Sequence, residues 1–357
     1  MLETQERVDV TLGFQAGICN QCRNLPEESC PKAEAFGATS KIKRYYWREI
    51  YFRTLDRFAE LASTRGYDDA ILASLELTEE YETLERQVVE EVKIEHENHP
   101  KYNFESKSSD QVLNECSVEV ERLDAEYHQV ADSRKAFVLF QGQPLHVEDF
   151  VAKTYESEGY LVMKLESMPF HALFAVFLWP IVQDARDAKT RFVAFGDRNA
   201  FEARESSVQH QIWTLLPSDF GSPGFGARRA TDFNDYIDKL PNERRDLLEV
   251  FDLNVGMSSD LRQYLWAHRE EAIDRARKLA TVLPVETIKR VLRYLANDYW
   301  GRYLGWPDLL LWKKDEVIFI EVKSSRDKLS ENQKAWITDN HNILGLRFKL
   351  VKIHRKN

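Results

Sequence analysis

Residues Gly305–Ser325 read "GWPDLLLWKKDEVIFIEVKSS" and contain two strongly apolar segments. The first, "DLLLW" from Asp308, is nearly all apolar, as expected of a strand buried on both faces. The second, "VIFIEVKS" from residue 317, is rich in β-branched and aromatic residues. The polar "KKDE" between them predicts a hairpin. Asp308 therefore begins one strand, and Glu321 and Lys323 lie near the end of the other.

These three polar residues suggest a metal site. Glu321 and Lys323 are two residues apart, so both project from one face of their strand. In a hairpin, Asp308 and Glu321 can approach each other, and two carboxylates suit a hard cation such as Mg²⁺ or Mn²⁺. A neighbouring lysine can position water and stabilise charge on a phosphoryl group. The alternative is structural: Asp308 as a turn residue after Pro307, and Glu321–Lys323 as a solvated pair.

The composition is that of a globular protein without membrane segments. The 357 residues are 43% hydrophobic and 30% charged, enough for two or three domains. No apolar run approaches the roughly 18 residues that span a bilayer, and the N-terminus does not resemble a signal peptide. We therefore expect a cytoplasmic protein, nucleoid-associated if bacterial, with no membrane partner. The net charge of −10 argues weakly against a general nucleic-acid coat protein, but leaves a local binding site open.

The chain divides into three predicted regions. Residues 1–40 are irregular and carry three cysteines, whereas 41–135 show helical apolar spacing to about residue 132 and form a possible DNA-binding domain. Residues 136–357 alternate strands and helices, with a helical insertion at about 184–300 that is interrupted by a loop at 216–232. This pattern predicts an α/β fold, a mixed sheet flanked by helices, after a mainly helical N-terminal region.

The motif Pro307-Asp308 … Glu321-Val322-Lys323 resembles that of the PD-(D/E)xK nuclease superfamily. Its surroundings, "VLRYLANDYWGRYLGWPDLLLW" before and "DKLSENQKAWI" after, resemble the VRR-type nuclease domain in the branch of the Fanconi-associated nucleases. Upstream, "YLVMKLESMPFHALFAVFLWPIV" is similar to the first nuclease strand and helix of that branch. The resemblance covers roughly Leu145 to Ile353.

The resemblance implies a restriction-endonuclease-like sheet and a metal-dependent DNA phosphodiesterase of the phosphodiesterase I type. Asp308, Glu321 and Lys323 would be catalytic, and Gln333 would position a ligand. The implied metal ligands are the carboxylates of Glu166, Asp308 and Glu321 and the backbone carbonyl of Val322. For Glu166 the alternative is a cap on the helix that starts near Pro169. The implied activity is a structure-selective 5′ exonuclease or flap endonuclease in DNA repair, acting on flap, nicked or branched DNA.

Two other functions stay open on the sequence. VRR-type domains also occur in restriction and mobile-element systems, so the nuclease could act there. The chain could also be a catalytically inactive DNA-binding protein that reads DNA through its cysteine region. The intact set of Glu166, Asp308, Glu321 and Lys323 argues against the inactive form. The sequence does not predict protein partners.

The N-terminal cysteines suggest a second, structural metal site. Cys19, Cys22 and Cys30 have the spacing of a short knuckle that suits Zn²⁺ or an iron–sulfur cluster, with Cys116 as a candidate fourth ligand. The alternative is a set of reduced cysteines without metal.

Basic residues mark two candidate DNA contacts. The segment "KIKRYYWR" interleaves cations with aromatic residues that could stack on unpaired bases or form core. The candidate phosphate-binding side chains are Lys41, Lys43, Arg44, Arg48, Arg228 and Arg229.

Four further side chains are assigned structural roles. We expect Glu148 and Glu158 to be surface carboxylates and Trp336 to pack on the sheet. His171, on an apolar helix, is interpreted as a core or helix-end histidine.

Overall fold

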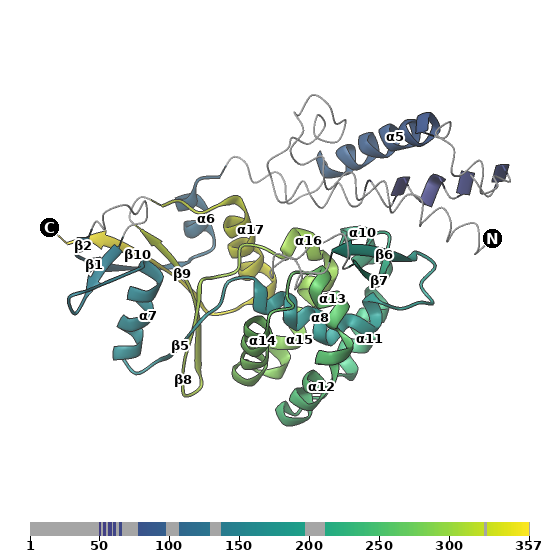
Figure 1. The fold of residues 1–357 in the computed structure, drawn as a ribbon. Helices are drawn as coiled ribbons and strands as arrows, with labels where there is room; N and C mark the ends of the chain where they lie inside the picture. The colour runs from purple at the N-terminus through teal and green to yellow at the C-terminus, as the bar shows by residue number, and fades with distance from the viewer. Residues whose placement is uncertain are drawn as a thin grey trace. The chain divides into compact units, whose positions relative to one another are not determined.

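The structure is a computed structural model (Figure 1). It divides into two compact units: unit 1 comprises Met1–Asn103, Leu178–Asp232 and Asn297–Gly301, and unit 2 comprises Phe104–Phe177, Phe233–Ala296 and Arg302–Asn357. The residues that the structure describes are 50, 53–54, 56–58, 60–61, 64–65, 78–97, 107–128, 137–196, 211–324 and 327–356.

Unit 2 is built on a five-stranded mixed sheet in the order β1-β10-β9-β8-β5. The first three strands of that order are parallel, and β8 is antiparallel to both β9 and β5. The predicted hairpin is confirmed as β8 and β9, with Lys314 at φ 53° in the turn. The strands are β1 (Glu119–Ala125), β5 (Leu161–Lys164), β8 (Leu309–Lys313), β9 (Glu316–Ser324) and β10 (Phe348–Arg355).

Helices cover the two faces of this sheet. On one face, Phe150, Val151 and Tyr155 of α7 (Val147–Ser157) pack with alternate strand residues such as Leu309, Leu311, Ile320 and Val351. The opposite face carries Phe348, whose ring contacts Trp336 of α17 (Glu331–Asp339) at 5.2 Å between centroids, which confirms the predicted packing of Trp336. We call these the α7 face and the α17 face. The mixed sheet flanked by helices is the fold that the sequence predicts.

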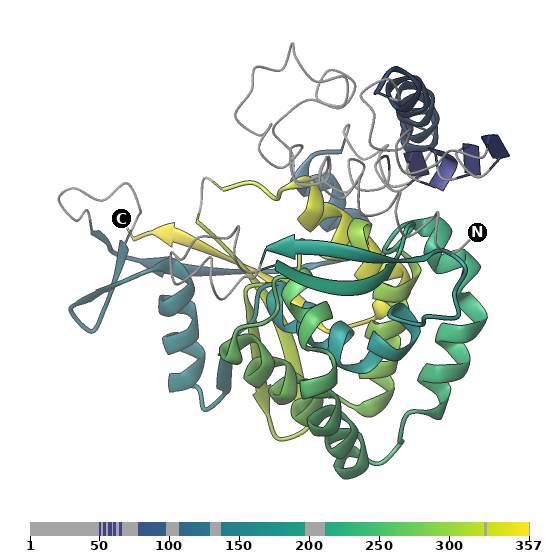
Figure 2. The ribbon, with the colours of Figure 1, turned by 45° about the vertical axis from the view of Figure 1, so that its right-hand side comes forward.

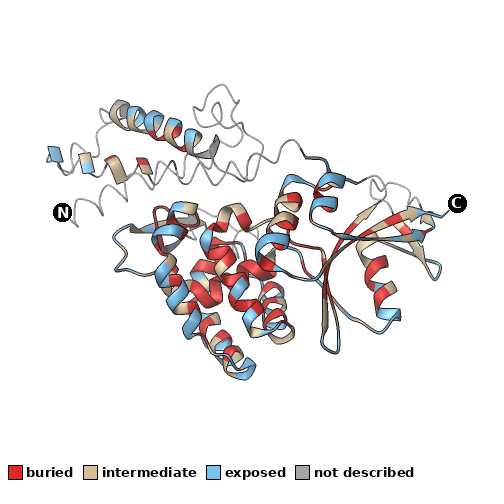
Figure 3. Ribbon diagram, turned by 180° about the vertical axis from the view of Figure 1, so that it is seen from behind, coloured by how far each residue is buried: buried red, intermediate tan, exposed pale blue. Residues whose placement is uncertain are grey.

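Apolar α8 (Met168–Val182) is buried along nearly all of its length, and Figure 3 colours the buried residues red. His171 within this helix is 3% exposed. The prediction that His171 lies in the core is therefore confirmed. The other helices are α5 (Thr78–Glu97), α6 (Ser109–Glu115), α10 (Pro223–Arg228), α11 (Ala230–Lys239), α12 (Arg244–Met257), α13 (Ser259–Tyr264), α14 (Glu270–Val282), α15 (Val285–Asn297), α16 (Tyr299–Arg302) and the π-helical η5 (Asn340–Leu344). A small sheet contains β2 (Tyr127–His128), β3 (Phe137–Phe140) and β4 (Gln143–Leu145).

Three local predictions are wrong. Residues 119–125, predicted helical, form edge strand β1, and the predicted helical insertion contains the hairpin β6 (Thr190–Gly196) and β7 (Gln211–Pro217), seen in Figure 2. The predicted loop at 216–232 contains α10 and the start of α11. In β1 the strand conformation follows from pairing with β10, a partner more than 200 residues away, which local periodicity does not report.

None of the helices in the described part of the chain combines the length and apolarity needed to cross a membrane. The predicted domain boundaries at residues 40 and 135 stay a prediction.

Candidate active site

Asp308 is held at the start of β8 by three backbone contacts. Its carbonyl accepts a hydrogen bond from the Leu165 amide at 2.7 Å, and the Pro307 carbonyl accepts one from the Glu166 amide at 3.1 Å. Its Oδ2 accepts a hydrogen bond from the Val322 amide at 2.8 Å. Asp308 is therefore fixed between β5 and β9, with one carboxylate oxygen already engaged.

Gly305 allows α17 to approach the loop that carries Asp308. Its φ is +86°, and a Cβ atom at this position would lie 2.2 Å from the Asn332 carbonyl oxygen in the first turn of α17. A side chain at residue 305 would therefore clash with backbone in a conformation that already favours glycine. This close approach brings the N-terminus of α17 to the end of the hairpin.

Glu321 lies at the centre of a polar cluster on the α17 face, with its side chain 2% exposed. Its carboxyl group lies close enough to that of Asp308 for the two to interact, as expected from a hairpin in which Leu309 pairs with Ile320. Lys323 Nζ lies 2.8 Å from Glu321 Oε1, as predicted for two side chains on one face of a strand. Gln333 Nε2 donates a hydrogen bond to the same oxygen.

The capping box of α17 orients Gln333. The Ser330 side chain accepts a hydrogen bond from the Gln333 amide, and Gln333 Oε1 accepts one from the Ser330 amide at 2.9 Å. With its oxygen engaged in the cap, the amide group of Gln333 presents its nitrogen to Glu321. The predicted positioning role of Gln333 therefore has a structural basis, although the role itself stays a prediction.

Both carboxyl groups have raised pKa values. The pKa of Glu321 is raised to about 8 by burial first and by the Asp308 carboxyl second, while Lys323 opposes the shift. Burial also raises the pKa of Asp308, the Val322 amide and Lys323 lower it, and Glu148 and Glu166 add to the rise. Among the described residues, Lys323 is the cation that lowers both pKa values, and it does not offset the effect of removing the two carboxyls from water. A divalent cation would supply the missing positive charge, and oxygen ligands are those that Mg²⁺ and Mn²⁺ accept.

Glu166 follows β5 in a left-handed backbone conformation. Its φ is +54° and its side chain is exposed. A non-glycine residue held there costs energy, and such residues cluster at functional sites. In the part of the chain that the structure describes, no three His, Cys, Asp or Glu side chains are grouped closely enough to hold a metal ion. The donor chemistry fits a divalent cation, and Glu166 as third ligand stays a prediction.

Glu148 was missed by the sequence analysis. Predicted as a surface carboxylate, it is partly buried in the first turn of α7 and raises the pKa of Asp308 electrostatically. Its position in an acidic helix start, "HVEDF", looks like ordinary helix capping, and its approach to Asp308 depends on the packing of α7 against the sheet. Glu158, at the C-terminus of α7, is exposed as predicted.

Residues 255–352 match the sequence model of the VRR-NUC domain, and this segment contains Asp308, Glu321, Lys323 and Gln333. The chain contains a VRR-NUC domain. Over 205 residues the chain is 23% identical to a Fanconi-associated nuclease 1 homolog of Arabidopsis thaliana, covering 55% of this chain and 20% of that protein. A homolog of the same name from Oryza sativa subsp. japonica is 49% identical over 53 residues, covering 13% of this chain and 6% of that protein.

These relatives place the VRR-NUC domain in the Fanconi-associated nuclease branch, and the matches span a fifth of their lengths or less. A crystal structure of paFAN1 bound to 5′-flap DNA with a gap aligns with a TM-score of 0.46 and 18% identity, covering 98% of this chain and 55% of that chain.

Three of the four cysteines lie outside the residues that the structure describes. Cys19, Cys22 and Cys30 are outside the described residues. Cys116 is partly buried at the C-terminus of α6, where burial raises the pKa of its thiol and Thr338 hydrogen-bonds to it. The predicted structural metal site therefore stays a prediction.

The candidate DNA-binding cations also lie partly outside the residues that the structure describes. Lys41, Lys43, Arg44 and Arg48 lie outside the described residues. Arg228 is bound by Asp187 and Asp219, and Arg229 by Asp184, Asp187 and Asp232. A phosphate would have to compete with these carboxylates for the two guanidinium groups. The ion pairs therefore argue against Arg228 and Arg229 as a phosphate-binding site.

Proposed function

We propose that this chain is a metal-dependent DNA phosphodiesterase, a structure-selective nuclease that acts on 5′ ends or flaps in DNA repair. The observation that carries the proposal is the juxtaposition of the partly buried Asp308 carboxyl with the buried Glu321 carboxyl, with Lys323 Nζ 2.8 Å from Glu321. The nuclease names of the VRR-NUC relatives support the same activity.

In this proposal, Asp308, Glu321, Glu166 and the Val322 carbonyl hold Mg²⁺ or Mn²⁺. A bound cation of this kind activates water and neutralises charge on the scissile phosphate. Asp308 is held in place by the Val322 amide, and Glu321 is oriented by Gln333 and Lys323, so the protein preorganises both carboxylates. Fixed ligands are effective because no reorganisation is needed at the moment of reaction.

Lys323 has a separate role from the carboxylates. Its ammonium group hydrogen-bonds to Glu321 and is 15% exposed, so it is both oriented and accessible to substrate. In the proposed reaction it donates a hydrogen bond to the attacking oxygen or to the phosphoryl oxygens, where negative charge develops. Gln333 positions Glu321 and does not itself contact the substrate.

The test is cleavage of end-labelled single strands, duplexes, 5′ flaps and 3′ flaps with Mg²⁺, Mn²⁺ or EDTA. We expect cation-dependent cutting of 5′ flaps that falls at least about 100-fold in Asp308→Asn and Lys323→Gln, the range seen when one preorganised group is removed. The matched control is Asp315→Asn, an exposed carboxylate in the turn at the other end of the same hairpin.

Full activity in either active-site variant would overturn the assignment of these residues. Cutting that follows base sequence rather than flap structure would favour the restriction or mobile-element alternative. Binding of DNA with no cation-dependent cutting by the wild type would favour the inactive DNA-binding protein.

A further inference from the structure

Three cations lie side by side across the sheet, starting at the proposed catalytic lysine. In the strand register, Arg122 of β1 is opposite Lys352 of β10, and Lys352 is opposite Lys323 of β9. Paired residues project to the same side of a sheet, and Lys323 lies on the side of Glu321, so all three belong to the α17 face. We call Arg122, Lys352 and Lys323 the basic row. Figure 1 shows the three neighbouring strands that carry it.

Among the described residues, carboxylates pair only weakly or not at all with the two outer members. In the described part of the chain, one carboxylate lies within 4.0 Å of Lys352 Nζ, that of Asp110, which is 83% exposed. Arg122 is exposed and forms no hydrogen bond or ion pair among the described residues. Like charges on directly paired strand positions are destabilising, so the basic row costs the folded protein stability.

The opposite face of the same two strands is arranged differently. There Lys349 of β10 is opposite Glu119 of β1, with Nζ 2.7 Å from the Glu119 carboxylate and 3.4 Å from that of Glu121. The pair β1–β10 thus matches opposite charges on the α7 face and like charges on the α17 face. The unmatched cations lie on the face that carries Glu321 and Lys323, where an anionic substrate would supply the compensating charge.

The spacing of the basic row suits a chain of phosphates. Neighbouring strands are about 4.8 Å apart, so the Cα atoms of Arg122 and Lys323 are about 10 Å apart. Arginine and lysine are the side chains that bind backbone phosphates of nucleic acids. Arginine and lysine side chains at these positions are long enough to reach successive phosphates on one strand.

We propose that Lys352 and Arg122 bind the phosphodiester backbone of the DNA strand held at the active site, at phosphates next to the scissile one. This inference rests on the proposed nuclease function and adds the path of the substrate: the strand leaves the catalytic centre across β10 towards edge strand β1. The occupant is DNA backbone, recognised by charge and not by base sequence.

The first test measures the salt dependence of binding. Binding of a fluorescent 5′-flap DNA in EDTA is followed by anisotropy over a range of salt concentrations, for the wild type and for the Arg122→Gln/Lys352→Gln double variant. Loss of two phosphate contacts should reduce the slope of log affinity against log salt by about 1.4 to 1.8. Both substitutions keep a polar side chain on the surface, and removing like-charge repulsion should leave the melting temperature unchanged or raised.

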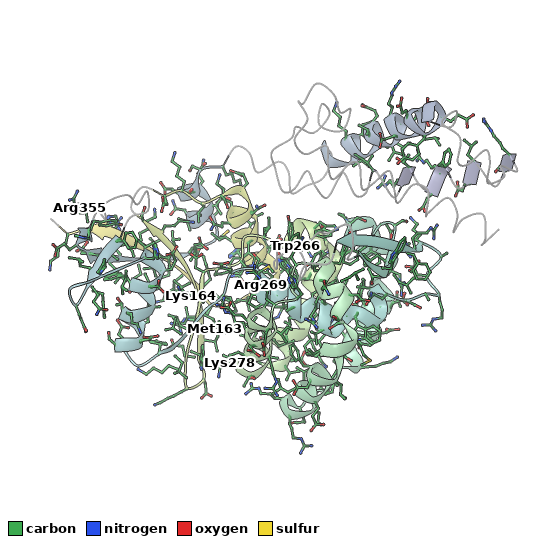
Figure 4. All side chains as sticks on the ribbon, viewed as in Figure 1. Met163, Lys164, Trp266, Arg269, Lys278 and Arg355 are labelled. Carbon is green, nitrogen blue, oxygen red and sulfur yellow. The ribbon has the colours of Figure 1, made fainter. Side chains whose placement is uncertain are left out.

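The matched control is Arg355→Gln. Arg355 is an exposed cation at the C-terminal end of the strand that carries Lys352 (Figure 4). By strand alternation it projects to the α7 face. We expect its slope to equal that of the wild type. An equal loss of slope in the control and the double variant would overturn the proposal, because it would mean that any cation on β10 contributes.

The second test locates the contact. DNA substrates carrying one uncharged methylphosphonate each, at successive positions around the cleavage site, are bound to the wild type and to Arg122→Gln. One or two positions next to the scissile phosphate should weaken binding to the wild type and have no further effect in the variant. Wild-type cleavage with an unchanged slope in the double variant would reject the basic row alone, whereas absence of any DNA binding or cleavage by the wild type would reject the proposed function itself.

Discussion

Gly305 shows how a single residue without a side chain sets the geometry of the active site. Its φ of +86° and the contact with the Asn332 carbonyl together exclude a Cβ atom. Gly142, in the β3–β4 turn, also has a positive φ of +81°, but a Cβ there would meet nothing within 4 Å. Substitutions at these two glycines therefore allow the effect of close packing on stability to be separated from the effect of backbone conformation.

We expect Gly305→Ala to lower the free energy of unfolding by about 2 kcal/mol more than Gly142→Ala does. Both variants force alanine into a left-handed conformation, at roughly 1 kcal/mol each, and only Gly305→Ala adds a clash in a packed region. Urea unfolding measures the difference, and the nuclease assay should show lost cleavage for Gly305→Ala alone. Equal destabilisation of the two variants would mean that α17 moves away at little cost.

At the scale of elements, α6 and α17 begin with the same capping box but have different neighbours. Ser108 and Gln111 cap α6, and Ser330 and Gln333 cap α17. The cap glutamine of α17 donates a hydrogen bond to Glu321. A helix start is thus part of the candidate active site in one case and a stability element in the other.

Ser330→Ala and Ser108→Ala should each cost about 1 kcal/mol of stability through the lost cap. Cleavage activity, measured at a temperature where both variants are folded, should fall in Ser330→Ala because Gln333 loses its orientation against Glu321. It should stay at the wild-type level in Ser108→Ala. If both variants keep full activity, Gln333 does not position Glu321.

At the scale of the whole molecule, the buried histidine His171 lowers the stability of the fold at acid pH. Burial lowers the pKa of His171 to about 3, whereas an unfolded histidine titrates near 6.5. The folded form therefore keeps the neutral imidazole, and the unfolded form gains a proton as the pH falls below 6.5. The stability associated with neutral His171 is complete above that pH and decreases between about 6.5 and 3.

As the pH falls from 7 to 5, protonation of His171 in the unfolded state should lower the free energy of unfolding by about 2 kcal/mol. Urea unfolding across this range measures the loss, and His171→Phe should reduce it by about that amount. The matched control is His341→Gln, an exposed histidine of η5, which leaves the buried imidazole in place. An unchanged pH dependence in His171→Phe would assign the acid sensitivity to other groups.

The sequence predicted the hairpin and its polar cluster because the relevant interactions are local. Asp308, Glu321 and Lys323 lie within sixteen residues, and strand periodicity with a polar turn brings them together. Glu148 and β1 were misread because nothing near them in the chain signals their partners. Glu148 reaches Asp308 through the packing of α7, and β1 is a strand because β10 pairs with it.

By itself, then, the sequence determined the α/β class and the β8–β9 hairpin with Asp308 and Glu321 as candidate metal ligands, since apolar periodicity and short spacing act over a few residues. Only the tertiary structure decided that Glu321 is buried, that Gln333 contacts it, and that Arg122 and Lys352 align with Lys323. Burial and register depend on which distant segments pack together. The raised pKa values and the basic row are consequences of that packing.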